Sequence, residues 1–337
     1  MRSVGRSRRS RLVALVAGAA AAVGAFAAPR PASAVLLYKT ATRNWQAPTG
    51  MKTNSGWQWF GKFGGFAGTP IARNYFITAS HIGGGVGTPL VLNGKSYQTT
   101  AVFDDPATDL RIFKVSTPFS SWAPLYTGSS EVGKWTVDYG RGTQRGSAVT
   151  KNNQTKGWKW GTDDRIRSWG ENYVAGTVDG GSGFGQLLRY TFSSDGKLAS
   201  EGALSNGDSG GPAFVRDSDG KWKLAGINYL VEGPFSTTGT NGSGFSASIF
   251  DKGGLYVGGD NAWKFTSDTS SNVPADWYAT RISDRQSWIR SIVGTVSASA
   301  PVSPAEISGV STVPEPASIG TVLVVGGVAL LRRKRRA

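Results

Sequence analysis

Short runs of aromatic and β-branched residues, separated by glycine-containing turns, dominate the middle of this chain. Examples are Trp57–Phe60, Tyr75–Thr78 and Leu110–Val115, and polar residues alternate with apolar ones in the last of these. Runs of this kind, bounded by turn residues, are typical of β-strands. Many short strands in series, with no internal repeat, predict an all-β protein built from barrels or packed sheets.

A hairpin is predicted near residue 217. Ala213–Val215 and Trp222–Ile227 flank Asp217-Ser218-Asp219-Gly220, and Asp-Gly is a common hairpin turn. The same four residues resemble the start of a calcium-binding loop. That loop needs a glutamate further on, and lysines stand here instead, so we interpret the segment as a turn.

One helix is predicted late in the chain, over Asp284–Ile292. Ser283 is the expected N-cap. Trp288, Ile289 and Ile292 share one face of such a helix.

The N-terminus has the pattern of a secretory signal. Residues 1–11 carry five arginines, an apolar stretch follows, and Ala32-Ser33-Ala34 suits signal peptidase. Glycines interrupt the apolar stretch and Pro29 follows it, which argues against an anchoring helix. We predict a signal peptide over 1–34, and Arg8-Arg9 is compatible with twin-arginine as well as general export.

The C-terminus carries a second targeting pattern. Residues 296–312 are rich in Ser, Ala, Val and Pro and are interpreted as a linker. Pro314-Glu315-Pro316, an apolar run over Ile319–Leu331 and a basic cluster over 332–336 follow. The apolar run is shorter than the roughly 20 residues of a spanning helix, and the basic cluster favours a cytoplasmic end.

This order of segments in 313–337 resembles the PEP-CTERM sorting signal of Gram-negative bacteria. The resemblance implies processing by an exosortase-type membrane enzyme, in addition to signal peptidase. An ordinary C-terminal anchor is the alternative. We therefore expect the working domain to occupy 35–295 and to act in the cell envelope, at the cell surface or in the medium.

Most of the net positive charge lies in the two predicted targeting segments. Of a formal net charge of +15, six positive charges lie in 1–34 and a net four lie in 313–337, which leaves +5 for the remainder. This small excess argues against nucleic acid as a partner. The chain has no cysteine, which excludes disulfides, thiolate nucleophiles and cysteine zinc sites. Stability must come from packing, for which about 260 residues suffice.

The segment Gly207–Pro212, with the sequence Gly-Asp-Ser-Gly-Gly-Pro, is the chemically most specific one. Glycines permit positive φ angles and a close approach of the backbone to a ligand. An acyl-transfer site needs this combination of an exposed hydroxyl and neighbouring N–H donors for the oxyanion. We predict Ser209 as a nucleophile; a Gly/Ser loop without chemistry is the alternative.

A serine hydroxyl needs a base to become a good nucleophile. His81 is the only histidine, and it follows a β-type run and precedes glycines, so a loop can present it. Asp104, Asp105 and Asp109 are the carboxylates available to orient the imidazole. Asp109 directly precedes a predicted strand, whereas the other two stand before a proline in a turn-like stretch. We select Asp109.

Three motifs in this order resemble the trypsin-like (chymotrypsin-fold, S1) serine peptidases, over about Trp57 to Ile292. They are Thr78-Ala79-Ser80-His81, Asp109–Val115 and Gly207–Pro212. The resemblance implies two packed six-stranded antiparallel β-barrels with a C-terminal helix and a site in the cleft between them. It implies a serine endopeptidase that acts on polypeptides through an acyl-enzyme and needs no cofactor or metal.

The resemblance also assigns roles to residues. Ser209 is the nucleophile, His81 the general base and then acid, and Asp109 its orienting partner. The N–H groups of Gly207 and Ser209 form the oxyanion hole.

The activated N-terminus of that family, a hydrophobic residue followed by Val-Gly-Gly, is absent. In the family, the carboxylate at the position of Asp208 receives the new ammonium group. Val35, released by signal cleavage, is the candidate partner here, and we hypothesise that no further proteolytic activation is needed. The segment Glu232–Ala275 exceeds the family's equivalent, which predicts an inserted loop near the cleft.

The resemblance predicts four substrate-binding residues: Ala203, Tyr229, Leu230 and Val231. Ala203 matches the base of the primary pocket, where trypsin-type members carry an aspartate for Lys or Arg. An alanine predicts a small or apolar preference instead. Cleavage only after Arg or Lys would point to Asp276, near the other wall.

Two rival functions remain open. A protease-like binding module without activity is one, although such relatives usually lose a member of the triad. An esterase is the other, since a triad also cleaves esters. Gly207–Gly211 matches the Gly-x-Ser-x-Gly elbow of esterases, but Pro212 and the following strand oppose the helix that this elbow needs.

Overall fold

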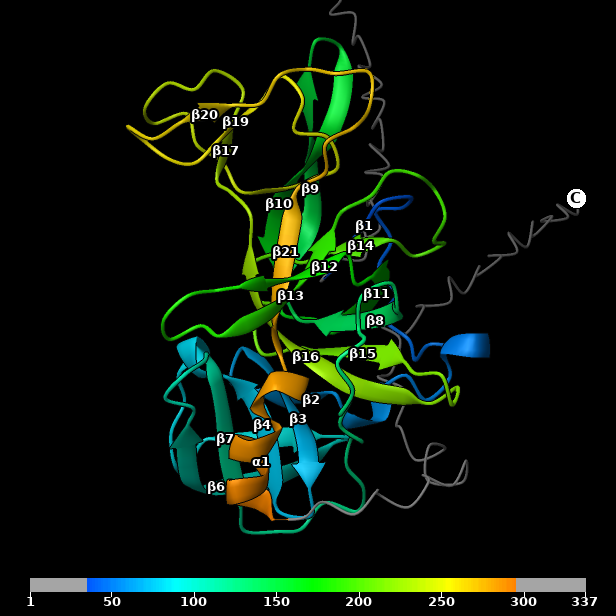
Figure 1. Ribbon diagram of the computed structural model, residues 1–337, viewed down its shortest axis with the longest axis vertical. Coiled ribbons are helices and arrows are strands. Elements are labelled where there is room, and N and C mark those ends of the chain that lie inside the picture. The colour runs from blue at the N-terminus through cyan, green and yellow to red at the C-terminus, as the bar shows by residue number, and fades with distance from the viewer. Residues whose placement is uncertain (1–34, 295–337) are drawn as a thin grey trace, which may run out of the picture. The chain divides into compact units, whose positions relative to one another are not determined.

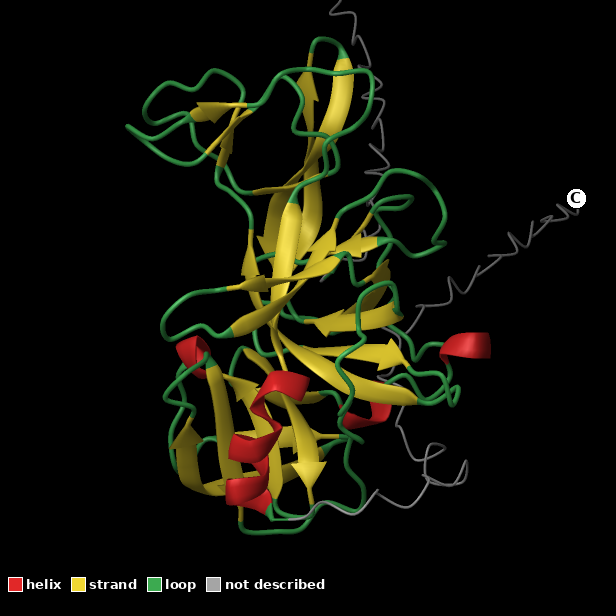
Figure 2. Ribbon diagram, viewed as in Figure 1, coloured by secondary structure: helices red, strands yellow, loops and turns green. Residues whose placement is uncertain are grey.

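The computed structural model describes residues 35–294 (Figure 1). The predicted signal peptide over 1–34, the linker over 296–312 and the sorting segment over 313–337 lie outside these residues. None of the helices in the described part is long and apolar enough to span a membrane. Strands predominate and helices are short, as Figure 2 shows.

The first half forms a closed antiparallel barrel of six strands in the order β2-β3-β4-β7-β6-β5. The strands are β2 (Gly61–Phe63), β3 (Phe66–Ala72), β4 (Tyr75–Ala79), β5 (Pro89–Leu92), β6 (Lys95–Asp104) and β7 (Leu110–Val115). Phe63, Phe76 and Phe113 fill its interior, with ring centroids 4.8–5.2 Å apart. The predicted strands over Tyr75–Thr78 and Leu110–Val115 are confirmed.

The strand expected at Trp57–Phe60 is wrong, because Trp57–Trp59 form a 3₁₀ turn. Residues three apart lie on the same face of such a turn. Trp57 and Phe60 accordingly lie side by side, with ring centroids 6.2 Å apart, and both are buried. One turn thus places these aromatic rings in one core, which two opposite strand faces could not do.

The second half is built on a seven-stranded antiparallel sheet in the order β11-β8-β15-β16-β21-β13-β12. The strands are β8 (Trp135–Gly140), β11 (Ser168–Tyr173), β12 (Gly176–Asp179), β13 (Gln186–Thr191), β15 (Pro212–Arg216), β16 (Trp222–Val231) and β21 (Asp276–Arg281). The predicted hairpin is β15–β16, where the Asp217 N–H donates to the Lys221 carbonyl at 2.9 Å. The expected second barrel has six strands, whereas this sheet has seven, and β12, paired only with β13, is its edge strand.

The first described residues pair with the second half of the chain. β1 (Leu36–Leu37) pairs antiparallel with β14 (Gly202–Ala203). Val35, Leu36 and Leu37 are almost fully buried. The first described residues therefore belong to the core.

A long hairpin extends away from the barrel, at the top of Figure 1. β9 (Thr143–Lys151) and β10 (Gln154–Asp163) pair with each other, and β10 also pairs with β18 (Ala247–Ile249). β17 (Phe235–Ser236), β19 (Tyr256–Val257) and β20 (Lys264–Phe265) form a small sheet. The buried Lys156 of β10 connects this hairpin to the chain after β18 and after β20. Its Nζ lies 2.6 Å from Asp251 Oδ2 and 3.0 Å from Asp268 Oδ1.

The predicted C-terminal helix is confirmed as α1 (Gln286–Val293), entered through a 3₁₀ turn at Ser283–Arg285. The expected N-cap is wrong, because the Ser283 hydroxyl donates to Glu131 instead. Arg285 donates two hydrogen bonds of 2.7 Å to Asp105 on the first barrel, and Ile289 is fully buried in a core that both halves share. The all-β class, with a closed six-stranded barrel and a final helix, is therefore as predicted.

Candidate active site

His81 lies in the 3₁₀ turn Ser80–Ile82, directly after β4. Its Nδ1 is 2.5 Å from Asp109 Oδ2, and its backbone N–H donates to Asp109 Oδ1 at 2.9 Å. The Ser80 N–H donates to the Asp109 carbonyl at 2.6 Å. Asp109 therefore holds both the ring and the backbone of His81. A proton on Nδ1 leaves Nε2 of the ring as the free base.

The two competing carboxylates have other partners. Asp104 pairs with Arg111 at the surface, and this hydrogen bond lowers the pKa of Asp104. Asp105 is buried and takes the two hydrogen bonds from Arg285. Of the three candidates, the structure brings only Asp109 to His81.

The loop between β14 and β15 carries the predicted nucleophile. Three of its N–H groups donate to backbone carbonyls: Asp208 to Ser205 at 3.2 Å, Gly210 to Asn228 at 3.0 Å and Gly211 to Asp208 at 3.1 Å. The N–H groups of Gly207 and Ser209 donate to no acceptor among residues 35–294. Gly207 has a φ of +98°, which favours glycine. Two backbone donors of this loop thus have no acceptor within the described residues.

The carboxylate of Asp208 holds this loop in place through hydrogen bonds. Its Oδ1 accepts the Gly142 N–H at 2.7 Å, and its Oδ2 accepts the Ser205 N–H at 2.7 Å. The Val35 nitrogen lies 3.5 Å from Oδ1. Burial raises the pKa of Asp208 to about 6, and these hydrogen bonds oppose the rise. Within the described residues, no Lys, Arg or His forms an ion pair with this carboxylate.

Glycine is required at Gly140, the last residue of β8, because the backbone there lies against the carboxylate of Asp208. A Cβ there would lie 1.8 Å from Asp208 Oδ1 and 2.4 Å from its Cγ. The end of β8 can approach the buried carboxylate only because this position has no side chain.

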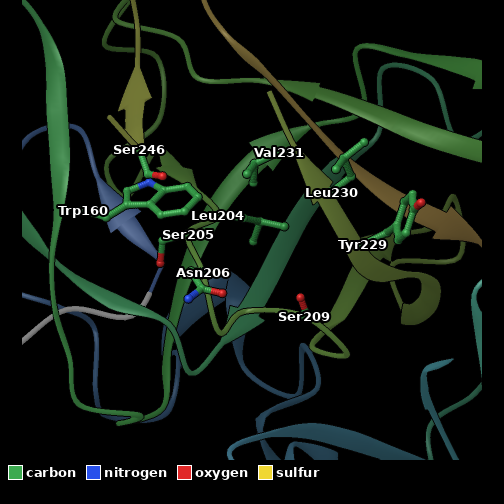
Figure 3. A pocket seen from close by; sticks show the side chains of 9 residues that line it. All are labelled: Trp160, Leu204, Ser205, Asn206, Ser209, Tyr229, Leu230, Val231 and Ser246. Carbon is green, nitrogen blue, oxygen red and sulfur yellow. The ribbon is translucent and has the colours of Figure 1, made fainter. Parts of the chain in front are cut away.

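Ser209 is half-buried and lines a pocket of about 330 Å³ (Figure 3). The pocket residues come from β10, from the nucleophile loop, from β16 and from the segment before β18. They are Trp160, Leu204, Ser205, Asn206, Ser209, Tyr229, Leu230, Val231 and Ser246. None of these side chains carries a formal charge. The predicted substrate-binding residues Tyr229, Leu230 and Val231 therefore lie together with Ser209.

Ala203, predicted at the base of the pocket, does not line it. Ala203 is buried and pairs with Leu36 in the β1–β14 ladder. Asp276, the acidic alternative, also lies outside the pocket, and its Oδ2 is 3.5 Å from Nη1 of Arg189. Leu204, one residue after Ala203, provides the apolar wall instead.

Tyr229 connects the pocket to the imidazole. Its ring centroid lies 5.8 Å from that of His81. Burial and, second, the negative charge of Asp109 raise the pKa of Tyr229. The structure thus brings His81, Asp109 and the pocket of Ser209 to one place, between the barrel and the seven-stranded sheet.

Several residues of the site were missed by sequence reasoning. Asn228 donates from Nδ2 to the Tyr139 and Asp208 carbonyls, at 2.8 and 3.2 Å, and so supports the loop. The only feature of the sequence that pointed to Asn228 was its position directly before Tyr229, a predicted substrate-binding residue. Trp160 and Ser246 reach the pocket through the pairing of β10 with β18, for which the sequence holds no local signal. Among residues 35–294, no cluster of three or more His, Asp or Glu side chains could hold a metal ion.

A comparison with protein-family models finds no match for this chain, and a comparison with curated protein sequences finds none either. Among solved structures, the chain is similar to neuropsin, a serine protease expressed in the limbic system of mouse brain. The TM-score is 0.42 and the sequence identity 13%, over 71% of this chain and 95% of neuropsin.

Proposed function

We propose that this protein is an exported serine endopeptidase with the triad Ser209, His81 and Asp109. The observation that carries the proposal is the 2.5 Å contact between His81 Nδ1 and Asp109 Oδ2, beside the pocket that Ser209 lines. An imidazole oriented by a buried carboxylate, beside a pocket lined by a serine, is the arrangement expected of an activated nucleophile.

The proposed reaction is acyl transfer. Oγ of Ser209 attacks the substrate carbonyl while Nε2 of His81 takes the hydroxyl proton. The free N–H groups of Gly207 and Ser209 bind the oxygen as it becomes negative. His81 then gives the proton to the leaving amine, the C–N bond breaks, and an ester to Ser209 remains. Water, activated by the same imidazole, hydrolyses this ester and restores the hydroxyl.

The pocket favours an uncharged residue on the acyl side of the scissile bond. Leu204, Val231 and Trp160 supply apolar surface, and Ser205 and Ser246 supply hydroxyl groups. A Lys or Arg side chain would enter without a counter-charge, which is costly for a buried cation. A small or apolar side chain suits this lining.

The working place we propose is outside the cytoplasm. Signal peptidase would release Val35, and an exosortase-type enzyme would process the segment 313–337. The basis of this proposal is the pattern of charges and apolar runs at the two ends of the sequence.

A Ser209→Ala variant tests the proposed function. We expect wild-type protein to hydrolyse denatured protein and to be labelled covalently by a fluorophosphonate, and the variant to do neither. Equal inactivity of both proteins, with the fold intact, supports a binding module. Hydrolysis of esters without hydrolysis of any peptide supports an esterase.

A further inference from the structure

Three arginines gather beside the nucleophile loop: Arg141, Arg165 and Arg167, which we call the arginine cluster. Arg141 directly follows β8, and the other two precede β11. Burial and then the positive charges of Arg167 and Arg165 lower the pKa of Arg141 to about 10. Arg141 is therefore close enough to the guanidinium groups of Arg165 and Arg167 for their positive charges to repel its own.

The cluster adjoins Gly207, one of the two free N–H donors. Nη1 of Arg165 lies 2.9 Å from the position that a Cβ on Gly207 would occupy. The same nitrogen donates to the Gly65 carbonyl at 3.2 Å, and the guanidinium lies 4.7 Å from the ring centroid of Phe66. Arg165 thus spans the gap between the nucleophile loop and the start of β3 on the first barrel.

The counter-charge of the cluster is incomplete. Asp163 pairs with Arg165 at 2.6 Å, and the second nearby carboxylate, Asp164, pairs with Arg43 at 2.6 Å. In the described part of the chain, no carboxylate forms an ion pair with Arg141 or Arg167, and Nε of Arg141 is buried without a hydrogen-bond partner. A buried donor without a partner costs free energy that a suitable acceptor returns.

The geometry of the guanidinium groups suits a carboxylate. Arg167 lies 4.1 Å from the ring centroid of Trp57, as Arg165 lies over Phe66. A guanidinium that contacts an aromatic ring can still donate hydrogen bonds from its edge, and Arg167 forms no ion pair within residues 35–294 that would occupy this edge. Two parallel N–H groups match the two oxygens of a carboxylate.

We propose that the arginine cluster binds a carboxylate of the substrate on the leaving-group side of the scissile bond. The proposal rests on the endopeptidase function proposed above. The pocket beside Tyr229–Val231 takes the acyl side and contains none of the three arginines. The leaving group must then pass the other side of Ser209, along Gly207 and Phe66. The carboxylate is an Asp or Glu side chain, or the free C-terminus of a short leaving peptide.

Fluorogenic peptides with one common acyl segment test this inference. The first series is amidated at the C-terminus and carries Glu, Gln or Lys at one of the three positions after the scissile bond. We expect kcat/KM for the best Glu peptide to exceed that for its Gln partner by about tenfold, as for a charged hydrogen-bonded pair. Lys in that position should be the poorest.

Two variants assign the preference to the cluster. Arg167→Gln should bring the Glu-to-Gln ratio of kcat/KM close to one. Arg141→Gln should have the same effect, and it provides the test if Arg167→Gln does not fold. Arg73→Gln is the matched control, since it removes the same charge from an exposed site on the first barrel and should keep the wild-type ratio. A second series with a free or amidated C-terminus distinguishes a terminal carboxylate from a side chain.

The outcomes separate the two proposals. Equal cleavage of the Glu, Gln and Lys peptides, with no gain from a free C-terminus, overturns the carboxylate site and leaves the endopeptidase function intact. A preference for Glu that survives both variants also overturns the site. Failure to cleave any peptide, by wild type and Ser209→Ala alike, overturns the endopeptidase function and this inference with it.

Discussion

The nitrogen of Val35 lies 3.5 Å from Oδ1 of Asp208, although 173 positions separate the two residues. Both are almost fully buried. Val35 has a φ of +27°, which is unfavourable for a β-branched residue. That angle exists only while the peptide bond to residue 34 is intact. Cleavage at this bond would relieve the strain and turn the amide into an α-amino group beside a carboxylate that forms no ion pair within residues 35–294.

We predict that protein beginning at Val35 is fully active and that one additional residue before Val35 lowers kcat/KM. A free α-amino group has a pKa of about 8, so at neutral pH it is a cation next to Asp208. An added residue moves this charge out of reach and leaves the carboxylate buried alone. N-terminal sequencing of active protein checks the start, and active protein that starts well downstream of Val35 contradicts the prediction.

Asp109→Asn should lower kcat by about 10⁴, because an amide in place of Oδ2 favours the wrong imidazole tautomer. Asp104→Asn is the matched control, since Asp104 pairs with Arg111 and leaves the His81 ring untouched. The kcat values on one peptide, with thermal melts of both variants, provide the measurement. Equal effects of the two substitutions would remove Asp109 from the triad.

Gly140→Ala should lower kcat/KM about a hundredfold, comparable to the loss of an oxyanion donor. The new Cβ meets Asp208 Oδ1, so the carboxylate must move and release Gly142 and Ser205. Gly85→Ala is the control, because a Cβ there meets nothing within 4 Å. If Gly140→Ala keeps wild-type activity, Asp208 is not the anchor of the nucleophile loop.

Glu201 makes the stability of the fold depend on pH. Its carboxylate is buried, and burial raises its pKa from 4.5 to about 8. The folded state therefore binds more protons than the unfolded state between these values. The free energy of unfolding should fall as pH rises through this window, by on the order of 5 kcal/mol.

Glu201→Gln should reduce this slope, because an amide keeps hydrogen bonds to the backbone without acquiring charge. The buried Asp138 and Asp208, whose pKa values burial also raises, should keep the remainder of the slope. Urea unfolding followed by tryptophan fluorescence at pH 5, 7 and 9, as approximate set points for this window, measures it. The exposed Asp284→Asn should retain the wild-type slope. A variant that still loses stability with pH as wild type does would assign the titration to another group.

Features set by neighbouring residues could be predicted from the sequence. The strand Leu110–Val115 and the turn at Asp217–Gly220 follow local patterns, and the structure has both. Asp109 could be chosen from three carboxylates because it directly precedes that strand. Local alternation and turn chemistry carry this information without knowledge of the distant chain.

Features set by distant pairing could not be predicted. The pocket wall from Trp160 and Ser246 depends on the register of β10 with β18. Ala203 illustrates how strongly the lining of the pocket depends on strand register, since successive side chains along a strand point to opposite faces. The expectation for the pocket base differs by one position from the structure, and that step moves Ala203 into the core and Leu204 to the pocket.

The paired hydrogen bonds from Arg285 to Asp105 have a consequence for how the chain acquires its structure. The helix α1, which packs on the first barrel, is synthesised after the strands of the second half. Residues that are adjacent in the finished protein are thus 180 positions apart in the order of synthesis. The first barrel therefore gains this contact only after the second half has been synthesised, and a chain that stops before α1 leaves the apolar residues around Ile289 without their cover.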